Sequence, residues 1–359
     1  MLISKEEFGI NWEQDTCSQS WRYSQKMLKL VSRTFALNIQ VLPLSLKKPI
    51  LLAYLFCRMA DTLEDDKDMA RDEKVRLLEI FRLIFVDREN WQEHTAAFRD
   101  ALPKHWKDSE DCDQLLTAWP RWPLYLFFDL SDKYVHAVSK WVIEMCDGMI
   151  QFSDHREGQS GWMGLQSVEE LDEYCYYVAG TVGMMLCDLF FAYSPLISAS
   201  KYKAMKELAV SFGLGLQITN IVKDMKEDAE RNTCFVPEAL FTKFNTSPQA
   251  LIEERQEEEL SRVVDYLTQK ALGHLEDAKD YTLLIPRLEP RIRLFCLWPL
   301  FMATATLVKV VADNQVLSQE KVKISRSDVK GIIKSTTLRV AFNSQIDKMF
   351  ETDKAKILC

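Results

Sequence analysis

The sequence of 359 residues contains few of the two residues that interrupt regular structure. Glycine and proline number only 11 each, which is low for a turn-rich β protein of this size. No stretch alternates apolar and polar residues as a half-buried strand does, and we find no repeat and no linker. Because apolar residues recur at helical spacing instead, we predict an all-α protein, with residues 1–359 forming a single helical domain around a central cavity.

Features of several other protein classes are also missing. The nine cysteines form no CxxC pair and the five histidines are dispersed, which argues against a zinc site and a disulfide framework. A net charge of -8 argues against nucleic acid as a partner. No GxGxxG follows a strand, so a Rossmann unit is excluded. We find no Ser/His/Asp or Cys/His constellation for nucleophilic catalysis.

No segment shows a targeting signal or a clear membrane span. The N-terminus contains acidic residues and no apolar run, unlike a secretory signal. Leu294 to Val308 comes closest to a span, but Pro299 interrupts it and it is shorter than the roughly 20 residues that a membrane requires. We expect a buried helix there and a cytoplasmic protein.

The stretch from Gly213 to Pro237 contains the densest group of acids. If it is helical, Gln217, Asn220, Asp224 and Asp228 recur every three or four residues and share one face. Like charges one turn apart disfavour a helix by about 0.2–0.5 kcal/mol unless a cation is supplied. A hard metal ion would supply it, and a solvated acidic turn is the alternative interpretation.

A second acidic stretch, DTLEDD, repeats that spacing earlier in the chain. Magnesium takes one or two carboxylates and completes its shell with water and phosphate oxygens. Two such clusters facing each other across a helical cavity would hold several magnesium ions and a diphosphate. The candidate ligands are Asp61, Glu64, Asp65, Asp224, Glu227 and Asp228.

Three predicted helices carry further features. The helix from Ser20 to Leu42 contains SRTF, whose arginine is either salt-bridged or a phosphate ligand. A single long helix is predicted from Leu124 to His155. In the helix from Leu171 to Tyr193, Gly180 and Gly183 favour close helix packing over a role in lining a channel for a hydrocarbon tail.

A magnesium diphosphate site beside aromatic walls suits the ionisation of an allylic diphosphate. The metal would neutralise the departing diphosphate. Ring faces such as those of Tyr54, Tyr174 and Phe35 would shelter the carbocation from water.

Four motifs in order resemble the squalene and phytoene synthase family of head-to-head prenyltransferases. They are SRTF, DTLEDD, YCYYVAGTVG and LQITNIVKDMKED, the last followed by a proline. Their residues resemble those of squalene synthases more closely than those of phytoene synthases. The resemblance runs from about Ser32 to at least Leu307. It implies an all-α isoprenoid synthase fold in which the six acids above hold magnesium.

The resemblance also implies roles for individual residues, by matching position. The residues that match contacts to substrate diphosphates are Ser32, Arg33, Arg58, Gln217 and Asn220. Lys223 occupies the position of a basic residue that the family has beside the second cluster. Tyr174 matches the tyrosine of the first half-reaction, and Tyr54 and Phe295 match aromatics of the second. NADPH would bind helix and loop residues, with Phe35, Lys323 and Arg326 as candidates; Phe35 is also a substrate-binding candidate.

The implied reaction joins two molecules of farnesyl diphosphate into presqualene diphosphate, which NADPH then reduces to squalene. The nearest alternative is a dehydrosqualene or phytoene synthase, which lacks the hydride step. An inactive member serving as an assembly or binding protein would be expected to lose acids from one cluster, and all six are present. A helical scaffold unrelated to isoprenoids is a further alternative.

Two departures from the family pattern stand out. Thr233 occupies the position where an arginine usually precedes the proline by four residues, and Arg231 lies two residues away. Either Arg231 takes over through a shifted turn, or the diphosphate or cofactor contacts differ. The eukaryotic members end in a membrane anchor that we do not find, so we expect a monomer that meets the membrane peripherally.

Overall fold

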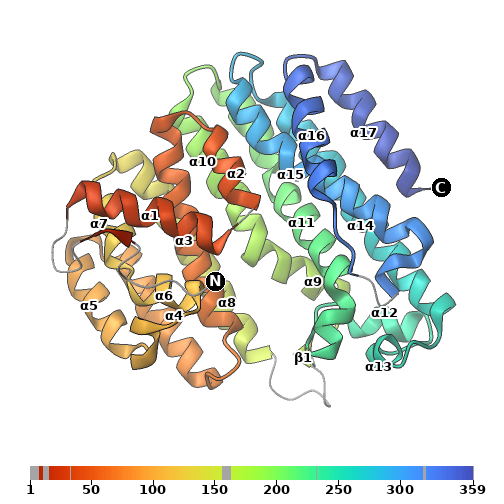
Figure 1. Ribbon diagram of the computed structural model, residues 1–359, viewed down its shortest axis with the longest axis horizontal. Helices are drawn as coiled ribbons and strands as arrows, with labels where there is room; N and C mark the ends of the chain where they lie inside the picture. Colours follow the sequence, from red (N-terminus) through yellow and green to blue (C-terminus); the bar gives the residue numbers. More distant parts are fainter. Residues whose placement is uncertain are drawn as a thin grey trace. The chain divides into compact units, whose positions relative to one another are not determined.

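The computed structural model describes residues 8–10, 16–32, 34–155, 163–231, 233–317 and 321–358 (Figure 1). Helices dominate these residues, and the strands among them are β1 (Met163–Gly164) and β2 (Thr233–Cys234), of two residues each. The two strands pair in parallel, Met163 opposite Thr233 and Gly164 opposite Cys234. The prediction of an all-α protein is therefore confirmed.

The chain forms two compact units. The first contains residues 1–154 and 188–193, and the second contains residues 155–187 and 194–359. The chain passes from one unit to the other within α10 (Thr181–Tyr193). The expectation of a single domain stays a prediction.

The first unit consists of helices of very different lengths. They are α1 (Cys17–Val31), α2 (Thr34–Val41), α3 (Leu44–Asp65), α4 (Arg71–Val86), η2 (Arg88–Asn90), α5 (Trp91–Ala101), η3 (Lys104–Asp108), α6 (Cys112–Ala118), α7 (Arg121–Phe128) and α8 (Asp132–His155). The apolar side of α3 packs on its neighbours through Phe56, whose ring meets Phe85 and Phe127 edge to face. This core fixes the helix that carries the first acidic cluster.

Two of the predicted helices are interrupted. Ser32 has an extended backbone and its Oγ accepts a hydrogen bond from the Phe35 N–H, so it separates α1 from α2. The predicted helix from Leu124 to His155 is likewise divided at residues 129–131, between α7 and α8. Serine and aspartate compete for backbone hydrogen bonds and so favour helix ends. The apolar periodicity of the sequence did not predict these two helix breaks.

The second unit is built around one long helix. Its elements are β1, α9 (Val168–Cys175), the π-helical turn η4 (Tyr176–Gly180), the start of α10, α11 (Ala199–Glu230), β2, α12 (Glu238–Lys243), α13 (Pro248–Ile252), α14 (Glu257–Leu284), α15 (Pro290–Val311), η5 (Ala312–Leu317), α16 (Arg326–Arg339) and α17 (Asn343–Ile357). The most extensive helix contact is that of α11 with α14, and the two run alongside each other in Figure 1.

Close backbone packing explains Gly183 of the motif YCYYVAGTVG and Gly213 of α11. A Cβ on Gly183 would lie 2.0 Å from the Ala209 carbonyl oxygen, and one on Gly213 would lie 2.2 Å from that of Ala179. Both distances are far below van der Waals contact, so only glycine lets the helices approach this closely. The prediction that Gly183 serves helix packing is confirmed.

Helix α15 is almost entirely buried, as predicted for Leu294 to Val308. Two helical segments of the described chain, Val168–Tyr193 and Pro290–Val311, are long and apolar enough to cross a membrane by composition. Burial of the second segment inside the protein accounts for its apolar composition.

Candidate functional site

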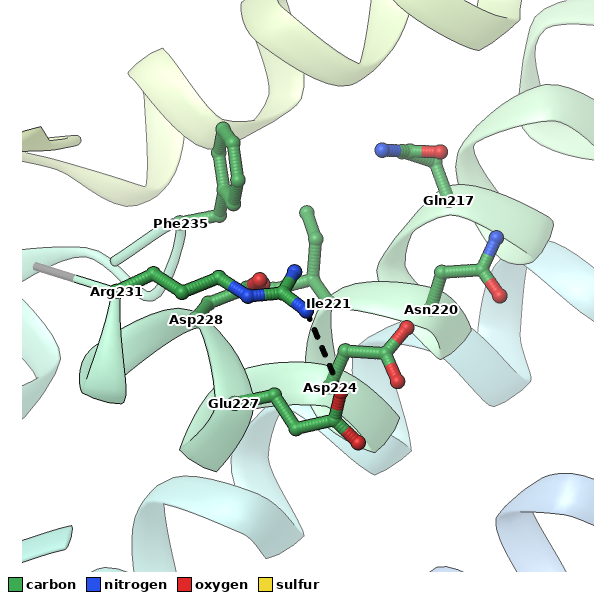
Figure 2. A pocket seen from close by; sticks show the side chains of 8 residues that line it. All are labelled: Gln217, Asn220, Ile221, Asp224, Glu227, Asp228, Arg231 and Phe235. Carbon is green, nitrogen blue, oxygen red and sulfur yellow. Dashed lines mark ion pairs between the residues drawn. The ribbon is translucent and has the colours of Figure 1, made fainter. Parts of the chain in front are cut away.

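A polar pocket of about 220 Å³ opens along α11 in the second unit. The side chains that line it come from three turns of this helix and from the segment that follows it (Figure 2). They are Gln217, Asn220, Ile221, Asp224, Glu227, Asp228, Arg231 and Phe235. The predicted amide pair and the whole second acidic cluster therefore share one pocket, which argues against a plain surface turn.

Basic side chains are held against these carboxylates. Lys223 Nζ lies 2.8 Å from Asp224 Oδ2. Lys321, in the segment before α16, lies 2.7 Å from Glu227 Oε1. The Arg231 guanidinium reaches back along α11, 3.8 Å from Glu227 Oε2 (Figure 2). The cluster is thus neutralised by side chains that a metal ion and its phosphate ligands would rearrange.

Two carboxylates of the cluster lie in different electrostatic surroundings. Burial, reinforced by the neighbouring charge of Asp224, raises the pKa of Asp228 to about 6. The hydrogen bond from Lys321 lowers the pKa of Glu227 below its usual range. A carboxylate whose charge is costly without a partner is the type of group that a divalent cation stabilises.

The acidic side chains of the described chain form no closed metal site. In the parts of the chain that the structure describes, no three acidic, histidine or cysteine side chains converge as ligands of one ion. Magnesium needs no such cage, because water and substrate oxygens complete its shell.

An aromatic wall adjoins the pocket. The ring of Tyr174 is buried and stacks on Phe235, with centroids 5.1 Å apart and planes at 20°. Phe235 is itself a lining residue. The predicted first-half-reaction tyrosine therefore belongs to the same constellation as the acids, through a phenylalanine that the sequence analysis did not single out.

In the first unit, α3 and α2 bring a second group of predicted residues together. The Phe35 and Tyr54 rings lie 5.6 Å apart. Arg58 Nη2 donates to the Tyr54 hydroxyl at 3.1 Å, one turn along the helix. Arg58 Nε lies 3.8 Å from Asp113 Oδ1 of α6, a residue absent from the sequence predictions.

The first acidic cluster lies on the last turns of α3. Burial raises the pKa of Asp61 to about 7, against the lowering effect of Arg58. Glu64 is buried and Asp65 is exposed. Asp66 accepts hydrogen bonds from the Asp68 and Met69 N–H groups, so it shapes the turn that follows α3.

The remaining predicted residues lie in several settings. Ser32 is buried at the α1–α2 break, Phe295 is buried in α15, and Arg33 lies outside the described residues. Lys323 and Arg326 are exposed and do not line the pocket. From the same segment, Lys321 contacts the acidic cluster at Glu227.

Three of the residues around the pocket were missed or left open by sequence reasoning. Arg231 lines the pocket and Thr233 does not, so the structure favours the shifted-turn alternative. The sequence offered one clue to Phe235, which lies two residues before Pro237, the proline that follows the motif. Lys321 had none, because its contact with Glu227 joins segments far apart in sequence.

Comparisons with known proteins agree with this geometry. The family model for squalene/phytoene synthase matches residues 28–328. The squalene synthase of Schizosaccharomyces pombe is 31% identical over 321 residues, which cover 89% of this chain and 66% of that protein. The squalene synthase of Nicotiana benthamiana is 31% identical over 322 residues, which cover 89% of this chain and 71% of that protein.

Solved structures show the same fold. The complex of TcSQS with the ligand E5700 has a TM-score of 0.79 at 25% identity, covering 94% of this chain and 91% of that one. A dehydrosqualene synthase complex has a TM-score of 0.62 at 21% identity, covering 90% and 97%, and is similar in fold alone. The chain therefore belongs to the squalene/phytoene synthase family, and that membership supports a prenyltransferase-type enzyme.

Proposed function

We propose that the protein condenses two molecules of farnesyl diphosphate head to head into presqualene diphosphate and reduces this intermediate with NADPH to squalene. The observation that carries the proposal is the pocket that joins the acidic face of α11 to Phe235, the ring on which Tyr174 stacks. Similarity to squalene synthases supports the reductive product over dehydrosqualene.

Magnesium would be held by Asp224, Glu227 and Asp228 on α11 and by Asp61, Glu64 and Asp65 on α3. When bound, it neutralises the charge that develops on a departing diphosphate. Asn220 and Gln217 lie one and two turns before Asp224 and would donate amide hydrogen bonds to diphosphate oxygens. Arg231 is the basic lining residue, and it would add a charge-assisted hydrogen bond.

Aromatic rings would stabilise the carbocation once the diphosphate has left. The Tyr174 ring stacks on Phe235, which lines the pocket. In the first unit, Tyr54 presents its ring to Phe35 and its hydroxyl to Arg58. Ring faces attract cations most strongly when water is excluded.

The reductive step has the least structural support. Lys323 and Arg326 are exposed on the segment around the start of α16, and Phe35 is partly exposed on α2. They stay the proposed contacts for NADPH. A cytoplasmic monomer that meets the membrane to deliver its oily product is likewise part of the proposal.

One incubation tests the function. The purified protein is mixed with farnesyl diphosphate and Mg²⁺, with and without NADPH, and the hydrocarbon is identified by mass spectrometry. We expect squalene only when NADPH is present. Dehydrosqualene under both conditions would assign the non-reductive reaction instead, and the absence of diphosphate release would reject both.

A further inference from the structure

Arg58 is positioned by two contacts from different helices. Its Nη2 donates to the Tyr54 hydroxyl at 3.1 Å, and its Nε lies 3.8 Å from Asp113 Oδ1. The second distance exceeds that of a hydrogen bond, so this contact is electrostatic. Both atoms of this pair are buried and neither has a hydrogen-bond partner in the described chain.

Asp113 is held firmly where it meets Arg58. It lies in the first turn of α6, and its N–H donates to the Asp111 carboxylate that caps this helix. The Thr117 hydroxyl donates to the Asp113 carbonyl oxygen one turn later. Helix α6 packs against α3. The backbone of Asp113 is therefore held in place, with its carboxylate close to Arg58.

Helix geometry offers Arg58 a competing partner. Asp61 follows it by three residues on α3, a spacing at which an arginine and an aspartate readily pair. In the structure the charge of Asp61 raises the pKa of Arg58 more than that of Asp113 does, but the ion pair within 4.0 Å is made with Asp113. Pairing with Asp61 instead would consume a proposed metal ligand and turn the guanidinium away from the Tyr54 hydroxyl.

We propose that Asp113 is a positioning residue that holds the Arg58 guanidinium beside Tyr54 and out of direct ion pairing with Asp61, so that Asp61 can bind a metal ion and Arg58 a substrate diphosphate. The inference rests on the proposed function, which gives Arg58 that diphosphate. It explains why a buried carboxylate oxygen faces a buried guanidinium nitrogen with no closer partner. Arginine suits this task because its planar group can contact a carboxylate and a phosphate at once.

The simpler interpretation is that Asp113 only stabilises α6. An acid in the first turn of a helix interacts favourably with the helix dipole. Asp111, at the N-cap of the same helix, also interacts favourably with the helix dipole, and it does not contact Arg58. Asp111→Asn is therefore the matched control, since it perturbs the same helix end.

The test compares Asp113→Asn, Asp113→Glu and Asp111→Asn in steady-state turnover of farnesyl diphosphate. In Asp113→Asn we expect KM for farnesyl diphosphate and the half-saturating Mg²⁺ concentration to rise roughly fivefold or more, with a smaller change in kcat. Asp113→Glu should recover most of the loss. Asp111→Asn keeps a capping acceptor for the Asp113 N–H, so it should leave KM unchanged.

A double-mutant cycle with Arg58→Lys tests whether Asp113 acts through Arg58. The KM effect of Asp113→Asn should largely disappear in the Arg58→Lys background. An equal effect in both backgrounds, or a wild-type KM in Asp113→Asn, would overturn the inference.

A second measurement compares the same variants without turnover. Calorimetry measures how tightly each variant binds inorganic pyrophosphate in the presence of Mg²⁺. Weaker binding in Asp113→Asn that Asp113→Glu restores would support the inference, and unchanged binding would overturn it. If Asp113→Asn does not fold, Asp113→Ser takes its place. Wild-type protein that binds pyrophosphate but releases no diphosphate from farnesyl diphosphate would reject the proposed function alone.

Discussion

Lys321 Nζ lies 2.7 Å from Glu227 Oε1, so the segment before α16 supplies a counter-charge to the acidic face of α11. Because the lysine competes with cations for this carboxylate, Lys321→Ala should lower the half-saturating Mg²⁺ concentration by about twofold to fivefold, the range expected of an exposed ion pair worth up to ~1 kcal/mol. Diphosphate release without NADPH measures it.

Lys330→Ala is the matched control for Lys321→Ala. Lys330 is an exposed lysine of α16 and does not line the pocket. Its replacement removes one positive charge from the same region and should leave the Mg²⁺ dependence unchanged. A Mg²⁺ requirement that rises in Lys321→Ala would mean that Lys321 binds substrate phosphate instead.

Replacing one carboxylate in either cluster should abolish turnover. Asp61→Asn or Asp224→Asn should lower the rate of diphosphate release by about a hundredfold or more, since a neutral amide binds magnesium weakly and leaves the departing charge unneutralised. Circular dichroism should show an intact helical fold. Glu230→Gln, at the exposed end of α11, controls for the loss of a charge. Near-normal activity in either aspartate variant would refute its role as a metal ligand.

Two glycine substitutions should change stability in opposite directions. In Gly183→Ala the new Cβ would lie 2.0 Å from the Ala209 carbonyl oxygen, so the helices must separate, at a cost of at least ~2 kcal/mol. A Cβ on Gly273 of α14 would meet no atom within 4 Å, so Gly273→Ala should stabilise the helix by about 1 kcal/mol. Urea denaturation of both variants measures the difference, and equal effects would contradict the packing argument.

The buried side-chain amide of Asn38 should lower the free energy of unfolding of the first unit. Asn38 of α2 is buried, and neither its Oδ1 nor its Nδ2 has a hydrogen-bond partner in the described chain. Asn38→Leu keeps a similar shape and removes this unpaired polar group, so it should raise the free energy of unfolding by about 1 kcal/mol or more. Asn38→Asp should lower it. A less stable Asn38→Leu protein would show that the amide has a bound polar partner.

Stability should also depend on the protonation of His274. Burial lowers the pKa of His274 in α14, with a further lowering by Lys270, and its Nδ1 lies 3.2 Å from Ser211 Oγ. The neutral ring is favoured by folding, so its stabilisation is present above the unfolded pKa of about 6.5 and is lost as pH falls through the lower folded value.

The measurement compares wild type with His274→Gln, which stays neutral, in urea denaturation at pH 7.5 and pH 5.5. The loss of stability on acidification should be smaller in the variant. His136→Gln, at an exposed histidine of α8, controls for the loss of a histidine as such. An identical pH dependence in wild type and His274→Gln would refute the argument.

The sequence by itself determined the helical class, the acidic face of α11 and the family. Gln217, Asn220, Asp224 and Asp228 share a face because they lie on one helix, where spacing along the chain fixes direction. The buried helix α15 and the packing role of Gly183 were predictable for the same local reason. Motif order then identified the family without any contact between helices.

Only the tertiary structure decided which side chains from other segments complete each site. Lys321 reaches Glu227, Phe235 covers Tyr174, and Asp113 meets Arg58, each across a gap in sequence that no periodicity spans. The helix breaks at Ser32 and at residues 129–131 were missed because single capping contacts compete with long apolar patterns. Long-range packing sets these contacts, and the spacing of residues along the chain carries no record of it.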